Sequence, residues 1–278
     1  MFKLAAFADE IDPNPDVQIE HCLKNGVRYI ELRSAIGLNV LDFPRPFQEE
    51  FKRKLDDVGM GVCCIGSPIG KVKLDQPFGL HLDRFRIALD MAEFFGAPFI
   101  RIFSYYPAEG STRAELVARF RDEVIRRMQQ KLDCMRGSKV VLVHENEANI
   151  YGETGADCAD LHRALPSLQF RAAFDSANFI MGGEDPGVNW PLLKPYVAHF
   201  HIKDAVAATK TMVPAGCGDA RIGEILQDAY ASGYHGFLTL EPHLRATGQF
   251  SGFSGSDLFA KAADALKGVL KARELPFG

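Results

Sequence analysis

Short runs of apolar residues alternate along the whole chain with longer stretches in which apolar residues recur every three or four positions. Continuous apolar runs are typical of strands that are covered on both faces, as in a parallel sheet. The longer periodic stretches predict amphipathic helices. The runs predict eight strands, which cover about residues 3–8, 27–32, 61–66, 98–103, 139–144, 171–175, 197–202 and 237–241.

Each predicted strand is followed by a predicted helix. One helix start is clearly marked, because Thr112 and Glu115 have the spacing of a capping box. Eight strand–helix units in a chain of 278 residues favour an α/β fold, a single (β/α)₈ TIM barrel that takes residues 1–278 as one domain. A doubly wound open sheet is the alternative, but no G-x-G-x-x-G motif follows the first strand. The predicted helices cover about residues 16–26, 47–58, 80–95, 112–135, 157–165, 190–194, 222–231 and 257–272.

Composition argues against several classes of protein. The chain has 32 basic and 36 acidic residues and no basic block, which disfavours a nucleic-acid surface. No apolar stretch approaches the ~20 residues that span a bilayer, and the first residues lack the features of a signal peptide. The six cysteines contain no C-x-x-C pair, so we expect reduced thiols and a cytoplasmic protein.

Polar groups follow or end the last four predicted strands. The carboxyl ends of barrel strands meet on one face, where Glu145, Asp175, His201 and Glu241 are therefore expected to converge. For any one carboxylate taken alone, capping of the next helix is the favoured explanation, but it explains four such groups on four consecutive strands less well, since Glu is a poor N-cap and His a poorer one. Three crowded carboxylates would repel one another, and a divalent cation would neutralise them. This ligand set favours Mn²⁺ or Mg²⁺, with Zn²⁺ or Co²⁺ as alternatives.

The segments HEN, FDSAN, HFHIKD and LTLEPH make the chain resemble the xylose isomerase-like TIM-barrel superfamily, in its sugar phosphate isomerase/epimerase branch. The resemblance spans essentially the whole chain. It implies one divalent metal bound through Glu145, Asp175, His201 and Glu241. It also implies that Glu145 and Glu241 act as acid and base.

The expected reaction is isomerisation or epimerisation of a small sugar or polyol-derived substrate. The metal polarises a carbonyl, a neighbouring proton is removed, and the enediolate is stabilised by the metal. A lyase of the inosose or dehydroshikimate dehydratase type and a non-catalytic sugar-binding barrel are the alternatives. The AP endonucleases of the superfamily need further His and Asp ligands that this chain lacks, since Asn178 stands at one of those positions.

Further residues on the same rim are expected to contact the substrate. Instead of contacting the substrate, Glu147 could be a solvated carboxylate in a loop. Lys203 could instead form an internal ion pair. His144 and His199 are predicted to face the helical layer, and the other histidines outside the site to lie at the surface. Whether the substrate is phosphorylated stays open, and such barrels are often homodimers or homotetramers. The predicted substrate contacts are Ser67, Glu147, Asn178, Lys203 and His243.

Overall fold

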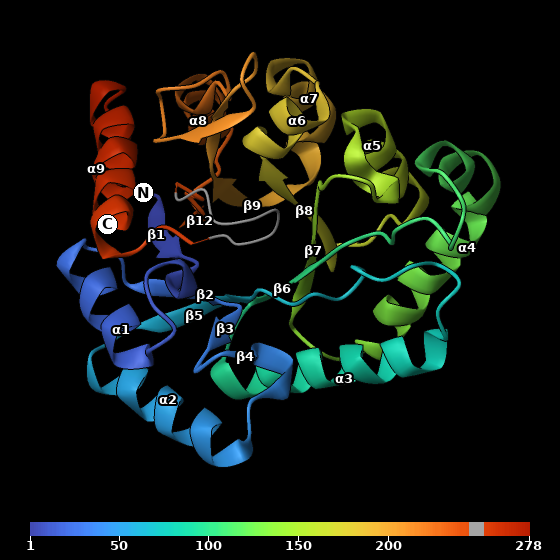
Figure 1. Cartoon of the computed structure of the whole chain (residues 1–278), viewed down its shortest axis with the longest axis horizontal. Coiled ribbons are helices and arrows are strands. Elements are labelled where there is room, and N and C mark those ends of the chain that lie inside the picture. Colours follow the sequence, from blue (N-terminus) through green and yellow to red (C-terminus); the bar gives the residue numbers. More distant parts are fainter. Residues whose placement is uncertain (245–252) are drawn as a thin grey trace.

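Eight parallel strands close into a barrel that is surrounded by helices in the computed structural model, which describes residues 1–244 and 253–278 (Figure 1). Strands that are neighbours in the barrel follow one another along the chain, and the last barrel strand pairs with the first. The predicted (β/α)₈ barrel is therefore confirmed. The barrel strands are β1 (Lys3–Ala6), β2 (Tyr29–Leu32), β5 (Gly61–Ile65), β6 (Phe99–Ile102), β7 (Val141–Glu145), β8 (Phe170–Asp175), β9 (Val197–Ile202) and β12 (Phe237–Leu240).

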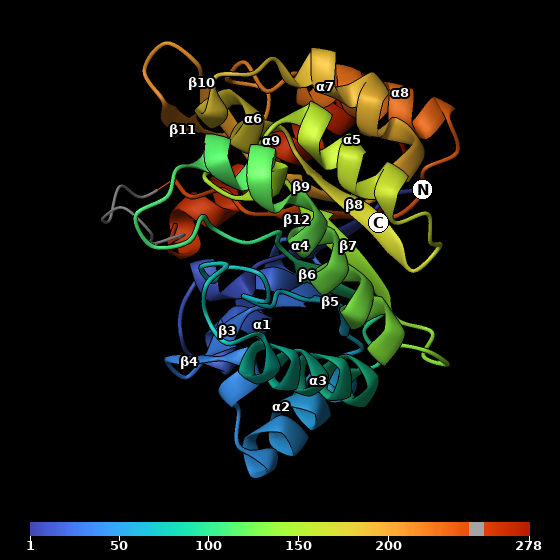
Figure 2. The same cartoon turned by 90° about the vertical axis from the view of Figure 1, so that its right-hand side faces the viewer.

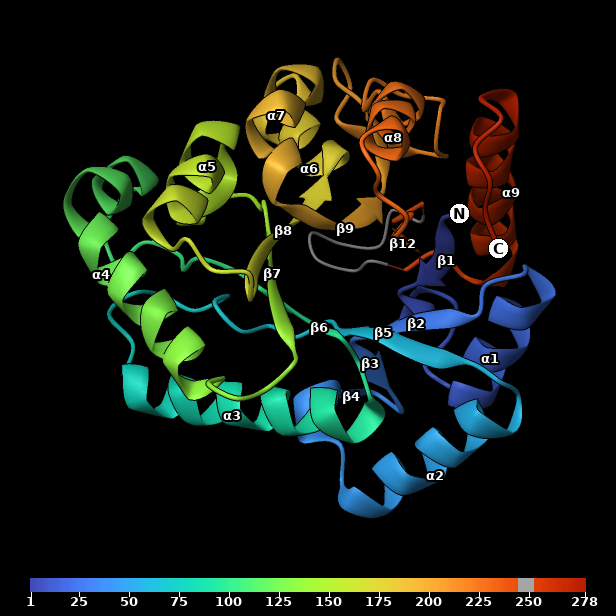
Figure 3. The same cartoon turned by 180° about the vertical axis from the view of Figure 1, so that it is seen from behind.

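The helices form a ring outside the strands, as the view from behind also shows (Figure 3). The capping box predicted at Thr112 is present, because its hydroxyl accepts from the Glu115 N–H and the Glu115 carboxylate accepts from the Thr112 N–H. The helices are α1 (Pro15–Lys24), α2 (Arg45–Asp57), α3 (Phe78–Phe95), α4 (Arg113–Cys134), α5 (Gly155–Ala164), α6 (Ser176–Gly182), α7 (Pro186–Leu193), α8 (Ile222–Ala231) and α9 (Ser256–Ala272).

Two short hairpins and the short helix α6 were not predicted. The hairpins are β3 (Ser34–Ala35) with β4 (Leu38–Asn39), and β10 (Asp204–Val206) with β11 (Thr211–Val213). They follow β2 and β9 and lie on the same side of the barrel (Figure 2). Each is too short to show a hydrophobic period, so the sequence pattern carries no signal for them.

The apolar core has two layers. The larger cluster packs the helices against the outer face of the strands. Inside the barrel, a smaller cluster of mostly small side chains leaves space for buried polar groups of β2 and β9. Within the described residues, no helix has the length and apolar character needed to cross a membrane. The smaller cluster consists of Ala5, Cys63, Cys64, Val143, Ala173 and Phe237.

Candidate active site

The four predicted ligands converge at the carboxyl end of the barrel. Glu145 and Asp175 are the last residues of β7 and β8, His201 lies one residue before the end of β9, and Glu241 directly follows β12. All four are buried, and each offers one ligand atom within 4.8 Å of the others. The strand ends thus bring together one donor from each of four successive barrel strands.

The His201 imidazole presents its two nitrogens to different partners. Nδ1 lies 3.1 Å from Glu145 Oε1 and 3.7 Å from Glu241 Oε2, whereas Nε2 lies 3.1 Å from Glu31 Oε2. Burial alone would lower the pKa of His201, but the carboxylates of Glu145 and Glu31 outweigh it and raise this pKa well above its usual range. Nδ1 is therefore the nitrogen that faces the ligands Glu145 and Glu241.

Asp175 uses its two carboxylate oxygens differently. Oδ1 accepts a hydrogen bond from the backbone N–H of Asn178 at the start of α6, so capping explains one of its two oxygens. Oδ2 lies 3.0 Å from Lys203 Nζ, which is also 3.3 Å from Glu241 Oε2. Burial and the neighbouring carboxylates of Glu145 and Glu241 outweigh Lys203 and raise the pKa of Asp175 to about 6. The acids are thus crowded enough to compete with one another for positive charge.

Two arginines, the buried Arg101 and the half-buried Arg33, contact the two glutamates. Arg101 Nη1 lies 3.2 Å from Glu145 Oε2, and Arg33 Nη1 lies 3.0 Å from Glu241 Oε1. Both guanidinium groups lie over the ring of Phe7, at 4.9 and 4.4 Å from its centroid. Burial raises the pKa of Glu145, but His201 and Arg101 outweigh it and bring this pKa to about 2. Both glutamates are therefore held as carboxylates.

The residue types and their burial fit a divalent cation. Asp175 Oδ2 and His201 Nδ1 are buried, and beside their ion-pair contacts with Lys203 and Glu145 neither makes a well-aligned hydrogen bond to a described residue. Three carboxylates and one imidazole provide the mostly oxygen ligation that Mn²⁺ and Mg²⁺ prefer. The cluster of Glu145, Asp175, His201 and Glu241 could therefore hold a metal ion.

A cleft of about 1420 Å³ opens above this cluster and is lined by Glu145 and Glu241. Of the residues predicted to contact a substrate, Glu147, Asn178, Lys203 and His243 line the cleft. The prediction that Ser67 contacts the substrate is wrong. Ser67 does not line the cleft, because it is fully buried and its hydroxyl donates to the backbone oxygen of Arg101 at 2.6 Å. Its side chain stabilises the pairing of neighbouring strands and is not exposed to a substrate.

Lys71 and Arg101, two cations that line the cleft, are each paired with a carboxylate. Lys71 Nζ lies 2.7 Å from Glu147 Oε2, and Arg101 is paired with Glu145. Both cations are thus already neutralised by a carboxylate, and neither is an unpaired charge that a phosphate group could occupy.

Asp204 follows Lys203 and organises the rim of the cleft. Its buried carboxylate accepts hydrogen bonds from the backbone N–H groups of Ala205, Gly216, Gly218 and Ala220 at 2.8 to 3.1 Å. A Cβ atom at Gly218 would lie 2.4 Å from Asp204 Oδ1, so only glycine allows this close approach. Asp204 is therefore a structural residue of the rim.

Several histidines correct the sequence prediction. His144 packs against the ring of His162 in α5 and faces the helical layer, as predicted. His199 instead faces the barrel interior and contacts Glu31, because residues two apart on a strand share a face and His201 also points inward. His81 and His162 are buried on the inner faces of α3 and α5 and do not lie at the surface.

Arg33, Arg101 and Glu31 are the contacts of the site that the sequence left open or missed. None of the three was among the predicted ligands or substrate contacts. A signal for Arg101 and Glu31 was present, because a charged residue inside a continuous apolar strand must find a buried partner.

A family model described as a xylose isomerase-like TIM barrel matches residues 19–269. The chain belongs to this family. The matched range includes the four converging residues and seven of the eight barrel strands, since only β1 precedes it. No curated protein matches the chain.

Solved structures of similar fold include several other xylose isomerase-like barrels. A D-tagatose 3-epimerase-like protein is 13% identical over 98% of both chains, with a TM-score of 0.81. A probable 3-DHS dehydratase, AsbF from Bacillus anthracis, is 17% identical over 96% of this chain and 98% of its own, with a TM-score of 0.74. A xylose isomerase-like barrel from Mycobacterium smegmatis, in complex with magnesium, is 17% identical over 98% and 97%, with a TM-score of 0.72. At these identities the likeness shows the shared fold.

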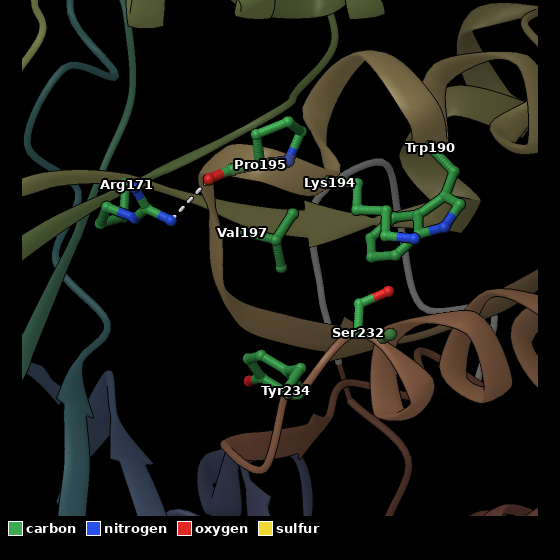
Figure 4. A pocket seen from close by; sticks show the side chains of 9 residues that line it. Arg171, Trp190, Lys194, Pro195, Val197, Ser232 and Tyr234 are labelled. Atoms are coloured by element: carbon green, nitrogen blue, oxygen red, sulfur yellow. Dashed lines mark hydrogen bonds between the residues drawn. The ribbon is translucent and has the colours of Figure 1, made fainter.

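A second hollow lies at the opposite end of this xylose isomerase-like barrel, where β8 and β9 begin (Figure 4). It has a volume of about 440 Å³ and is lined by Arg171, Trp190, Lys194 and Tyr234 among others. Arg171 donates a hydrogen bond to the backbone oxygen of Pro195 at 2.7 Å. Active sites of TIM barrels lie at the carboxyl ends of the strands, so the larger cleft is the candidate active site.

Proposed function

We propose that this protein, with residues 1–278 as one domain, is a divalent-metal-dependent sugar isomerase or epimerase. The single observation that carries the proposal is the convergence of Glu145, Asp175, His201 and Glu241 next to an open cleft that both glutamates line. The similarity in fold to a D-tagatose 3-epimerase-like protein supports it. The substrate would be a small sugar or a ketone derived from a polyol.

The four converging residues would hold one divalent cation, with Mn²⁺ or Mg²⁺ favoured over Zn²⁺ or Co²⁺. Such an ion, when bound, polarises a carbonyl group and acidifies the adjacent C–H bond. The buried position of the ligands excludes water from most of their surface and strengthens the interaction between opposite charges.

Glu145 and Glu241 would move the proton. Both are ionised, so either can accept a proton from a carbon next to a carbonyl. Return of a proton to the other face of the same carbon epimerises the substrate, and return to the neighbouring carbon isomerises it. Asn178 Nδ2 donates to Glu145 Oε1 at 3.1 Å and Arg101 contacts the other oxygen, so this carboxylate is held from both sides.

The rim of the cleft would orient the substrate. Lys203, His243, Glu147 and Asn178 line it with donors and acceptors that match sugar hydroxyl groups. Burial lowers the pKa of His243, but Glu241 and Glu10 outweigh burial and raise this pKa to about 9, so His243 is a cationic donor at neutral pH.

A lyase is the second candidate, and the observation in its favour is the similarity in fold to the probable 3-DHS dehydratase. Such an enzyme would remove the same type of proton and then expel a β-hydroxyl group. The residues that remove the proton would be the same, so the products must separate the two functions.

The test is exchange of the substrate's α-proton with solvent. The metal-loaded protein is incubated with a panel of ketoses and polyol-derived ketones in D₂O, and deuterium incorporation and products are followed by NMR. We expect incorporation that requires the metal and falls by about 10²–10⁴-fold in Glu241→Gln. The matched control Glu224→Gln removes an exposed carboxylate on α8 that pairs with Arg221, and it should retain full exchange.

Each other outcome has a definite meaning. A dehydrated product would assign the lyase function, and full exchange in Glu241→Gln would contradict the role of Glu241. Failure of every compound to exchange with metal bound would favour a non-catalytic sugar-binding barrel. A bound ion located away from the four predicted ligands would overturn the site.

A further inference from the structure

We propose that Glu31 is a positioning residue that holds His201 so that Nδ1 faces the proposed metal centre. This inference rests on the proposed function, because it concerns how one of the four ligands is presented. Glu31 lies on β2, across the barrel from β9, and its side chain is fully buried. A buried carboxylate is costly unless it is paired, so its place in the barrel interior calls for a partner.

One oxygen of Glu31 contacts two histidines of the same strand. Glu31 Oε2 lies 2.7 Å from His199 Nε2 and 3.1 Å from His201 Nε2. The two imidazole rings are two residues apart on β9 and meet edge to face, with centroids 5.3 Å apart. The carboxylate thus contacts both histidine side chains by which β9 faces the barrel interior.

The hydrogen bond at one imidazole nitrogen decides which nitrogen is left for a metal. When Nε2–H donates to a carboxylate, Nδ1 becomes the ligating atom and the ring orientation is fixed. In His201 the nitrogen that Glu31 does not contact is Nδ1, which lies 3.1 Å from Glu145 Oε1 and 3.7 Å from Glu241 Oε2. The ring of Phe7 packs against His201 at 5.1 Å between centroids and limits its rotation from the other side.

His199 would support Glu31 and would not bind the metal itself. Its Nε2 contacts both Glu31 Oε2 and the hydroxyl of Thr239 at 3.0 Å, which lies on β12. Glu31 is thereby held between two histidines, and loss of Thr239 Oγ1 leaves the contact with His201 in place. This difference provides a matched control within the same buried layer.

The test measures the affinity for Mn²⁺ and Zn²⁺ by calorimetry in four forms of the full chain. We expect Glu31→Leu to bind about 10–100-fold more weakly than the wild type, as is common when a carboxylate behind a histidine ligand is removed. Glu31→Gln should lose less, because an amide oxygen still accepts from Nε2–H. Thr239→Val should bind within twofold of the wild type.

A second measurement reports which nitrogen of the His201 ring carries the proton and which binds the metal. In Zn²⁺-loaded protein with ¹⁵N-labelled histidine, NMR should show His201 with a protonated Nε2 and a metal-bound Nδ1. Glu31→Leu should lose this single state. Should Glu31→Leu fail to fold, the affinity and spectrum of Glu31→Gln decide.

The outcomes separate this inference from the proposed function. A wild type that binds no metal overturns the proposed function, and this inference with it. A wild type that binds metal through Nε2, or a Glu31→Leu variant with unchanged affinity and spectrum, overturns the role of Glu31 alone.

Discussion

The two halves of the barrel contribute different kinds of residue to the candidate site. The later strands β7, β8 and β9 and the end of β12 carry the four predicted ligands. The earlier half, from β1 to β6, supplies groups that surround them. These are Phe7, Glu31, Arg33 and Arg101. The comparison teaches that the buried acidic cluster takes part of its counter-charge from the earlier half of the barrel, through Arg33 and Arg101, in addition to Lys203 of the later half. These contacts are as much part of the site as the ligands.

The largest expected effect comes from removing a counter-charge of the earlier half. Arg101→Met leaves the buried Glu145 without its arginine partner, and breaking a buried ion pair costs about 3–5 kcal/mol. Denaturant unfolding in EDTA should therefore show a loss of this size. Added Mn²⁺ should restore part of it, since a divalent cation would replace the missing charge.

Arg171→Met is the control for that substitution. Arg171 also lies on a barrel strand, but it donates to a backbone oxygen at the opposite end of the barrel. Its removal should cost less than about 1 kcal/mol and show no dependence on Mn²⁺. Equal losses in the two variants would show that the counter-charge of Arg101 has no special importance for Glu145.

Two buried lysines sharpen the same comparison. Lys203 lies between Asp175 and Glu241, which outweigh burial and raise its pKa above the usual range. Lys131, on α4 in the earlier half, contacts the Tyr105 hydroxyl and Met128 Sδ. Burial, with the charge of Arg127, lowers its pKa from 10.5 to about 7. A buried cation thus keeps its proton where acids face it and tends to lose it where they do not.

The lowered pKa of Lys131 makes stability depend on pH. Between about pH 7 and 10.5 the unfolded chain binds more protons at this group than the folded protein, so stability rises with pH across that window. Lys131→Met should remove this slope and stabilise the protein by about 2–4 kcal/mol at pH 7. Denaturant unfolding at several pH values measures both, with exposed Lys139→Met as the control. A slope unchanged in Lys131→Met would contradict the assignment.

The smallest expected effect lies within the later half. Asn178→Ala removes the amide that donates to Glu145 Oε1 and to the backbone oxygen of Asn146. Because Arg101 still holds the other oxygen of Glu145, we expect about tenfold weaker metal binding in calorimetry. A loss larger than that of Glu31→Leu would reverse the order of importance proposed for the two halves.

The sequence predicted the barrel and the converging ligands well. Continuous apolar runs mark parallel strands, and the carboxyl ends of such strands must meet, so Glu145, Asp175, His201 and Glu241 could be placed together before the fold was known. The inward direction of His199 was also predictable, since it is two residues before His201. The burial of His162 follows from the helical spacing to Cys158 and Leu165.

The contacts between halves could not be predicted in the same way. Arg33 and Glu241 are 208 positions apart, and no local pattern states that their side chains meet. The hairpins β3–β4 and β10–β11 are held by contacts with the rest of the fold and are too short for a period to appear. Side-chain partners across a barrel depend on rotamers and on register, which the hydrophobic pattern does not encode.

The carboxylate of Asp204 has a consequence for how the cleft can vary in length and shape. Four backbone amides between Ala205 and Ala220 converge on this one group, and Gly218 is packed against it without room for a side chain. An insertion between residues 214 and 220 would break at least one of these bonds. An insertion at the tip of the β10–β11 hairpin, residues 207–210, would leave all four intact. We therefore expect changes of chain length on this rim to be tolerated at the hairpin, which borders the cleft through Lys210 and Thr211, and not between residues 214 and 220.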